Sequence, residues 1–363
     1  MSTYLFPGQG SQIKGMGESL FDEFPDVTKK ADEILGYSIK SLCLLDESGV
    51  LDSTAYTQPA LYVVNALSYL QKVNLLGRKP DFLAGHSLGE LNALQAAGAV
   101  SFEEGLQLVK KRGELMSKSP SGAMAALLNI QEDAIAQCLQ SEGLDLVDIA
   151  NVNSPRQIVI SGDFEQVQAS MKPLENAGAR FIPLNTSGAF HSRQMLAAKN
   201  EFEEYLRGFS FKEITIPVIS NVHALPYQQE SIADNLSEQI CKPVKWMQSI
   251  RYLLDRGEFE FEELGVGDVL TKLVSAISAA YTEEKDIALI ASVEEQTAII
   301  RQRVNDWNEQ RIIGTPVNVD GYSDVLATRS KAAMIFGHSA AIYLEGYRGY
   351  FLLDDISVMN NVS

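Results

Sequence analysis

The sequence predicts an α/β protein with three parts: a main body built on a parallel sheet, a small inserted unit, and a β-rich C-terminal segment. Short apolar runs alternate with helical patterns through the first 121 residues, which is typical of a parallel sheet with helical connections. Residues 122–188 follow the order β-α-β-β-α-β, and residues 315–354 alternate apolar and polar side chains between glycines. The 363 residues, 45% of them hydrophobic, suffice to bury a large core.

The main body, expected over residues 1–121 and 189–300, begins with a buried strand at 3–6 that opens into a glycine-rich loop at 7–12. Its other expected elements are a helix over 53–76, a strand over 81–84, a helix over 90–97, an amphipathic helix over 102–116 and a helix-rich stretch over 202–279. Together they indicate a parallel α/β sheet.

The inserted unit is expected over residues 122–188. Its strands are predicted at 122–128, 146–152, 157–161 and 180–184, and its helices at 132–140 and 164–177. This order is that of a ferredoxin-like, or split βαβ, unit.

The third part, residues 301–363, is expected to be a small β-rich appendage or a linker. Its segment Gly337-His338-Ser339-Ala340-Ala341 imitates a catalytic serine turn, yet it lacks the closing glycine and the following helix. We therefore interpret it as a buried strand turn.

Gly85-His86-Ser87-Leu88-Gly89 follows the strand at 81–84 and precedes the helix at 90–97, which is the sequence form of a nucleophile elbow. Glycine is needed on both sides because the strand turns sharply into the helix and leaves the serine strained and exposed. We predict that Ser87 lies at the carboxyl end of its strand, with the Leu88 N–H free to help bind an oxyanion.

Composition excludes several classes of function. The net charge of -17, with no basic stripe, argues against a nucleic-acid partner. Cys43, Cys138 and Cys241 are odd in number and lack C-x-x-C or zinc spacing, so we interpret them as reduced core thiols and expect no metal. Neither a signal peptide nor an apolar run of membrane-spanning length is present, so a soluble, cytoplasmic protein is expected. No heptad pattern compels association, and a monomer is expected.

A serine nucleophile needs a base, and the chain has four histidines. His86 flanks the serine and should pack beside the turn, away from the hydroxyl. His223 is expected in a solvated loop, and His338 lies in the C-terminal segment. His191 lies in a loop of small residues where the chain re-enters the main body. From the pattern alone, a structural role and the role of base explain His191 equally well.

Five separated motifs nevertheless fall in register with one family. They are Phe6-Pro7-Gly8-Gln9-Gly10-Ser11-Gln12, Gly85-His86-Ser87-Leu88-Gly89-Glu90, Arg112-Gly113, Gly122-Ala123-Met124-Ala125 and Ala189-Phe190-His191-Ser192. Over about residues 1 to 300 the chain resembles the malonyl-CoA:acyl carrier protein transacylase family. It is most similar there to the free-standing acyltransferases that serve polyketide synthases. The resemblance implies an α/β-hydrolase-like core with a ferredoxin-like insert.

The resemblance also implies a ping-pong acyl transfer through a Ser-His dyad. Ser87 would attack the thioester, and His191 would act as the base. The backbone N–H groups of Gln9 and Leu88 would hold the oxyanion. The main-chain oxygen of Gln239 would orient the imidazole, so the identity of the Gln239 side chain is expected to matter little.

The family pattern assigns the acyl pocket as well. The Arg112 guanidinium would pair with the free carboxylate of a malonyl group, which an acetyl group lacks. Without the resemblance, the sequence favours the interpretation of Arg112 as part of a solvated face that already bears Lys110 and Lys111. Phe190 would fill the space that an α-methyl group needs. Asn153 and His86 are expected to line the pocket, although Asn151 is an alternative to Asn153.

The implied substrates are malonyl-CoA and the phosphopantetheine thiol of an acyl carrier protein, with no bound cofactor. Carrier proteins are acidic, as this chain is, so docking would need a local basic patch. The residues considered for it are Lys110, Lys111, Arg193, Lys242 and Lys245. Two alternatives stay open: a hydrolase of the same family that clears acyl groups from carrier proteins, and a catalytically silent docking module.

Overall fold

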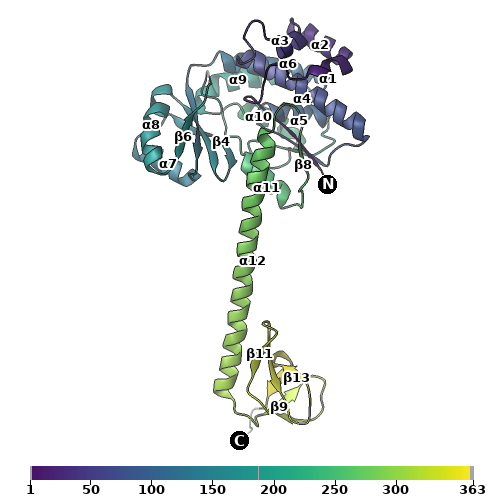
Figure 1. The fold of residues 1–363 in the computed structure, drawn as a ribbon, viewed down its shortest axis with the longest axis vertical. Helices are drawn as coiled ribbons and strands as arrows, with labels where there is room; N and C mark the ends of the chain where they lie inside the picture. Colours follow the sequence, from purple (N-terminus) through teal and green to yellow (C-terminus); the bar gives the residue numbers. More distant parts are fainter. Residues whose placement is uncertain (1, 187, 360–363) are drawn as a thin grey trace. The chain divides into compact units, whose positions relative to one another are not determined.

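The computed structural model describes residues 2–186 and 188–359 and divides into two compact units, Met1–Ala280 and Tyr281–Ser363. The division falls inside one long helix, α12 (Val269–Gln310), and not at residue 300 as expected from the sequence (Figure 1). The helix runs on past the last buried residue of its first part, Ile277, so nothing in its local pattern marks the boundary. Within the described residues, no helix has the length and apolar character to cross a membrane.

The first unit is built on a parallel sheet with the strand order β7-β2-β1-β8. Its strands are β1 (Thr3–Phe6), β2 (Phe82–Gly85), β7 (Val218–Ile219) and β8 (Phe261–Glu263). All four residues of β1 are buried, as expected for a central strand of a parallel sheet. Because the strands are parallel, their carboxyl ends meet at one edge, where β1 and β2 run into the glycine-rich loop and the elbow.

Helices surround this sheet, and the middle of one of them is completely buried. α4 (Thr54–Leu76) carries a continuous buried stretch from Thr57 to Leu67. α6 (Phe102–Ser117) starts at a capping box in which the Ser101 hydroxyl and the Glu104 carboxylate each accept a backbone N–H. The other helices are α1 (Glu18–Glu23), α2 (Pro25–Leu35), α3 (Ile39–Leu45), α5 (Gly89–Ala96), α9 (Leu196–Leu206), α10 (Ile232–Glu238) and α11 (Trp246–Leu254).

A second sheet, antiparallel throughout, has the order β4-β5-β3-β6. Its elements follow one another as β3 (Ala123–Leu128), α7 (Glu132–Ser141), β4 (Val147–Ser154), β5 (Gln157–Gly162), α8 (Phe164–Asn176) and β6 (Arg180–Pro183). Both helices lie beside this sheet (Figure 1), and the apolar side chains between them form a separate core that includes Leu127, Ile135, Ile160 and Leu174. This segment therefore has its own hydrophobic interior.

In its residues up to 359, the second unit contains the end of α12 and six short strands in two three-stranded antiparallel sheets. The strands are β9 (Pro316–Val319), β10 (Leu326–Ala327), β11 (Ala333–Ile335), β12 (Ser339–Tyr343), β13 (Tyr350–Leu352) and β14 (Ile356–Val358). Its small core gathers Val317, Ile342 and Leu344, with Trp307 of α12 packed against it.

The elbow-like segment of the second unit is the hairpin turn between β11 and β12, where Gly337 has a φ of 76°. It was expected to be buried, but His338 is exposed, and Ser339 begins a strand and no helix. The segment therefore lacks the closing glycine of an elbow in its sequence, and in the structure it forms a hairpin turn in place of a strand–turn–helix.

Candidate active site

Ser87 stands at the turn from β2 into α5 with a φ of 52°, in the left-handed region that side chains rarely adopt. The turn is tight enough that neither flanking glycine tolerates a larger residue. A Cβ on Gly85 would lie 1.9 Å from the Gly89 carbonyl carbon, and one on Gly89 would lie 2.0 Å from the Phe6 oxygen. The strand, the turn and the helix are therefore packed backbone against backbone.

The glycine-rich loop after β1 lies against the same turn. A Cβ on Gly8 would meet the His86 oxygen at 2.4 Å and the Leu88 nitrogen at 3.7 Å. Among the described residues, the backbone N–H groups of Gln9 and Leu88 donate to no protein acceptor. These two donors, expected from the sequence to bind an oxyanion, are unpaired in the structure and border the same cavity as Ser87.

The base expected from the sequence lies beside the serine. His191 Nε2 is 2.8 Å from Ser87 Oγ, although the two residues are 104 positions apart. The other ring nitrogen, Nδ1, is 2.8 Å from the main-chain oxygen of Gln239. A carbonyl only accepts, so Nδ1 carries the proton and Nε2 presents its lone pair to the serine hydroxyl. This is the arrangement that general-base activation of Ser87 requires.

His191 is 4% exposed, and its burial lowers the pKa of the imidazole to about 3, with the nearby Arg112 cation as the next cause. The ring is therefore neutral in the resting site and able to take a proton. Its backbone φ is 58°, so the base, like the nucleophile, is held in a left-handed conformation.

Arg112, on α6, is 1% exposed and reaches the nucleophile directly. Its Nη2 donates to Ser87 Oγ (3.1 Å) and to Gln239 Oε1 (2.8 Å), and its Nη1 donates to Gln58 Oε1 (2.7 Å). Within the described part of the chain, its Nε–H has no acceptor, and no carboxylate lies within ion-pair distance of the guanidinium. Burial lowers the pKa of Arg112 to about 10, so the group remains a cation near neutral pH.

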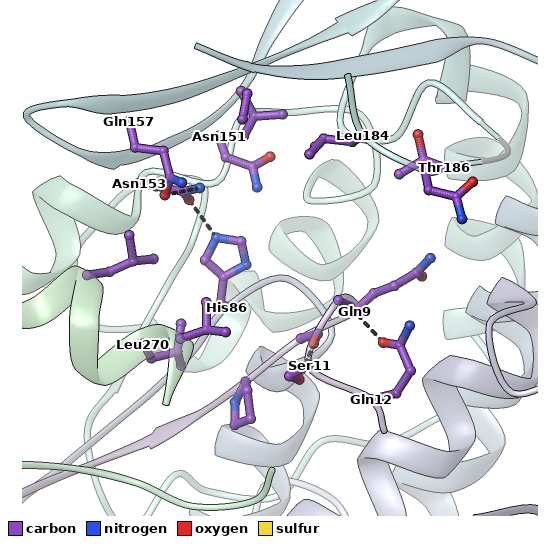
Figure 2. A pocket seen from close by; sticks show the side chains of 18 of the residues that line it. Gln9, Ser11, Gln12, His86, Asn151, Asn153, Gln157, Leu184, Thr186 and Leu270 are labelled. Carbon is purple, nitrogen blue, oxygen red and sulfur yellow. Dashed lines mark hydrogen bonds between the residues drawn. The ribbon is translucent and has the colours of Figure 1, made fainter. Parts of the chain in front are cut away.

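Ser87, His191 and Arg112 line one small cavity of about 110 Å³. Gln9 and His86 border both this cavity and a larger outer pocket of about 460 Å³ (Figure 2). The two cavities are therefore neighbours, and the inner one holds the reacting atoms.

The remaining residues assigned to the acyl pocket also reach these cavities. Phe190 lines the inner cavity, and Asn153 lines the outer pocket. His86 Nε2 is 2.9 Å from Asn153 Oδ1, and its ring lies 5.5 Å from that of Trp246, so it packs beside the turn as expected. Asn151, the alternative to Asn153, borders both cavities, and its buried Oδ1 has no partner among the described residues.

The side chain of Gln239 is much more engaged than expected. Besides its contact with Arg112, it donates from Nε2 to the Ser87 main-chain oxygen (2.7 Å) and to the Glu90 carboxylate. These contacts argue against the expectation that its identity matters little, because both ends of the amide are bonded inside the site.

Two buried residues of the site were missed in the sequence. Glu90 is 0% exposed, and Asn221 accepts the Ser87 N–H at its Oδ1 (2.7 Å). A signal for Glu90 was present, since it is the one charged residue in a helix that follows the elbow and is buried along most of its length. Asn221 comes from a loop far from Ser87 in the sequence, and no local sequence pattern predicted its role.

The other histidines and the cysteines lie apart from this chemistry. His223 is exposed, as expected. The three cysteines are free, but only Cys43 is fully buried, where burial raises its pKa to about 12. The described residues contain no cluster of His, Cys, Asp and Glu that would hold a metal ion.

The basic residues considered for partner docking do not form one patch. Arg193 and Lys242 line a groove of about 710 Å³ that also reaches His191, and Arg193 pairs there with Asp148. Lys110, on α6, donates to the Ile34 main-chain oxygen. Neither Lys110 nor the remaining two, Lys111 and Lys245, borders this groove.

An elbow serine with a buried histidine partner places the chain in the class of serine-dependent acyl-group enzymes. Residues 3–309 match the model of the acyl transferase domain, and the chain belongs to this family.

The relatives agree with this class. The polyketide biosynthesis malonyl CoA-acyl carrier protein transacylase BaeC of Bacillus velezensis is 57% identical over 280 residues, which is 76% of this chain and 96% of that protein. A crystal structure of malonyl CoA-acyl carrier protein transacylase from Burkholderia pseudomallei matches with a TM-score of 0.75 and 51% identity, covering 77% of this chain and 98% of that one. A malonyl-transacylase solved in complex with its type II polyketide acyl-carrier protein matches at a TM-score of 0.72 and 33% identity, covering 76% and 92%.

Proposed function

We propose that this chain transfers a malonyl group from malonyl-CoA to the phosphopantetheine thiol of an acyl carrier protein in polyketide biosynthesis, through an acyl-enzyme on Ser87. The names of the relatives support the reaction, and the buried Arg112 cation beside the nucleophile is the single observation that carries the substrate. A cation that is 1% exposed and without a carboxylate partner among the described residues is stabilised by an anionic ligand.

In the first half-reaction, Ser87 Oγ bonds to the thioester carbonyl carbon while its proton passes to His191 Nε2. The carbonyl oxygen becomes an oxyanion, which the free N–H groups of Gln9 and Leu88 are placed to receive. When the C–S bond breaks, the imidazolium returns the proton to the departing CoA sulfur. Malonyl is then held as an ester of Ser87.

In the second half-reaction, His191 takes the proton of the phosphopantetheine thiol, and the sulfur attacks the ester carbonyl. Collapse of the intermediate returns a proton from His191 to Ser87 Oγ and releases malonyl on the carrier. Ser87 and His191 thus serve both half-reactions, and neither half-reaction uses a bound cofactor.

Selectivity for malonyl follows from the charge of Arg112. A malonyl carboxylate offers the guanidinium two strong acceptors, whereas an acetyl group leaves the cation to neutral amides such as that of Gln58. We propose that Phe190, together with Asn153 and His86, shapes the pocket around the acyl chain. The groove with Arg193 and Lys242 is our candidate for the carrier-protein side. Both side chains are exposed there, and Arg193 is paired with Asp148.

We further propose that residues 1–121 and 189–280 form an α/β-hydrolase-like core with a ferredoxin-like subdomain at 122–188. The order β4-β5-β3-β6, with α7 after β3 and α8 after β5, supports the second assignment. The parallel strands β1 and β2 with the elbow at their carboxyl ends support the first.

The test is intact-protein mass spectrometry after brief incubation with malonyl-CoA or acetyl-CoA, followed by a holo carrier protein. We expect a malonyl adduct on the wild type that passes to the carrier, and none on Ser87→Ala. Ser339→Ala is the matched control, because it alters the elbow-like hairpin of the second unit, and it should behave as the wild type.

An adduct that forms equally with acetyl-CoA would contradict the role of Arg112. If the adduct is lost to water faster than to the carrier, the hydrolase of the same family becomes the better description.

A further inference from the structure

Glu90 is a charged side chain with no exposure to solvent, placed in the first turn of α5 three residues after the nucleophile. Its Oε1 accepts the backbone N–H of Asn221 and the hydroxyl of Tyr227, each at 2.8 Å. Its Oε2 accepts from Gln239 Nε2. All three of these partners donate to the carboxyl group, which is the pattern that a carboxylate satisfies and a carboxylic acid does not.

The first partner leads to the nucleophile. Asn221 Oδ1 accepts the Ser87 N–H, and Asn221 Nδ2 donates to the Gly85 main-chain oxygen, both at 2.7 Å. The asparagine therefore bridges the two sides of the elbow. Glu90 fixes the backbone of that asparagine, so the carboxylate stabilises the loop that grips the serine.

The second partner leads to the base. Gln239 presents its main-chain oxygen to His191 Nδ1 and its side-chain oxygen to Arg112 Nη2. Its amide thus lies between a carboxylate and a guanidinium. This polarity fixes which way the amide is turned, with nitrogen toward the anion and oxygen toward the cation.

We propose that Glu90 is a positioning residue whose carboxylate holds the Ser87 elbow and the His191-orienting segment in one arrangement. It touches neither reacting atom, and it acts through Asn221 and Gln239. Its negative charge also stabilises the Arg112 cation, with the Gln239 amide between them. Because the two groups do not touch, the guanidinium has no direct anionic partner that would compete with the substrate. This inference rests on the proposed function, because it explains how the dyad is held for that reaction.

The charge of Glu90 is sensitive to pH near neutrality. Burial raises its pKa to about 7, while the hydrogen bonds from Asn221, Tyr227 and Gln239 and the charge of Arg112 lower it. The other titratable groups facing it are Arg112 from α6, Tyr227 after β7, and His191 through Gln239. Acylation of Ser87 should therefore increase as pH increases through about 7, where the carboxylate forms.

The experiment is quench-flow mass spectrometry of the malonyl adduct on the full chain from pH 5.5 to 9, comparing the wild type with Glu90→Gln. The carboxamide has nearly the same shape, but its NH₂ group must face one of the donors. We expect acylation to be about 10- to 100-fold slower above pH 8, with the pH dependence near 7 abolished. Glu165→Gln, an exposed first-turn glutamate of α8, is the control and should match the wild type.

Tyr227→Phe tests the same inference should Glu90→Gln fail to fold, because it removes only one of the hydrogen bonds to the carboxylate. It should move the pH midpoint of acylation upward. The proposal is overturned if folded Glu90→Gln, or Tyr227→Phe, keeps the wild-type rate and midpoint. A wild type that forms no malonyl adduct would instead refute the proposed function.

Discussion

At the scale of the residue, Arg112 combines full burial with direct contact to the nucleophile. Arg112→Ala should slow malonylation of Ser87 by about 10²- to 10³-fold, because the malonyl carboxylate loses a charge-assisted bidentate partner. Acetylation should fall much less. Comparison of kcat/KM for malonyl-CoA and acetyl-CoA checks this, with Lys111→Ala on the same helix as control. An equal fall for both thioesters would show that Arg112 serves structure and not selectivity.

His191 makes stability depend on pH in a defined direction. Its pKa is about 3 in the folded protein and ordinarily about 6.5, so between these values the unfolded chain binds a proton that the folded site refuses. This group therefore lowers stability as pH falls from about 6.5 toward 3. His191→Gln should lose less free energy of unfolding than the wild type between pH 7 and 4.5, as measured by urea denaturation.

The exposed His223 supplies the control, since His223→Gln should follow the wild type at both pH values. Indistinguishable losses in wild type and His191→Gln would mean that the buried ring accepts a proton after all.

The site was predicted from sequence where chemistry follows a local motif and missed where it depends on contacts distant in sequence. Ser87 and His191 came from the elbow and a family motif, and they lie 2.8 Å apart. Asn221 and the amide of Gln239 act through partners 134 and 152 residues away along the chain. No periodicity encodes such contacts, because they exist only after the segments have packed.

At the scale of the element, the elbow depends on close packing of backbone, which Gly89→Ala tests. The added Cβ would meet the Phe6 oxygen at 2.0 Å, so β1 or α5 must shift. We expect a loss of about 2 to 4 kcal/mol in the free energy of unfolding together with loss of Ser87 acylation. Gly208→Ala is the control, since its nearest contact is the Tyr205 oxygen at 3.5 Å. Equal stability of the two variants in thermal and urea unfolding would contradict the prediction.

The sequence pattern predicted the ends of several elements closely. β1 begins and ends at Thr3 and Phe6 as expected, and α4, α6, α7 and α8 lie within a residue or two of the predicted ranges. The helices α1 to α3 were not predicted, since they are short and separated by single turns. The part of α12 beyond residue 280 was missed because its apolar residues, such as Ile287 and Leu289, are exposed on different sides and trace no single face.

At the scale of the whole molecule, every residue assigned to the site lies in the unit Met1–Ala280. Residues 282–296 of α12 are all exposed, so their backbone is the accessible place for a protease between the two compact units. We expect limited proteolysis to cut there first and the fragment that ends near residue 280 to keep its rate of Ser87 malonylation. Mass spectrometry of the digest with malonyl-CoA added afterwards measures both. First cleavage inside β1–α11, or an inactive fragment, would contradict this division.

The positive φ angles of Ser87 and His191 carry a consequence for how this chain can change over generations. At both positions glycine would relax the backbone, so a variant selected for robustness alone would drift toward glycine there. The serine and the imidazole persist only while acyl transfer is under selection. The two side chains that perform the chemistry are thus those that a lineage freed from catalysis would be expected to discard first.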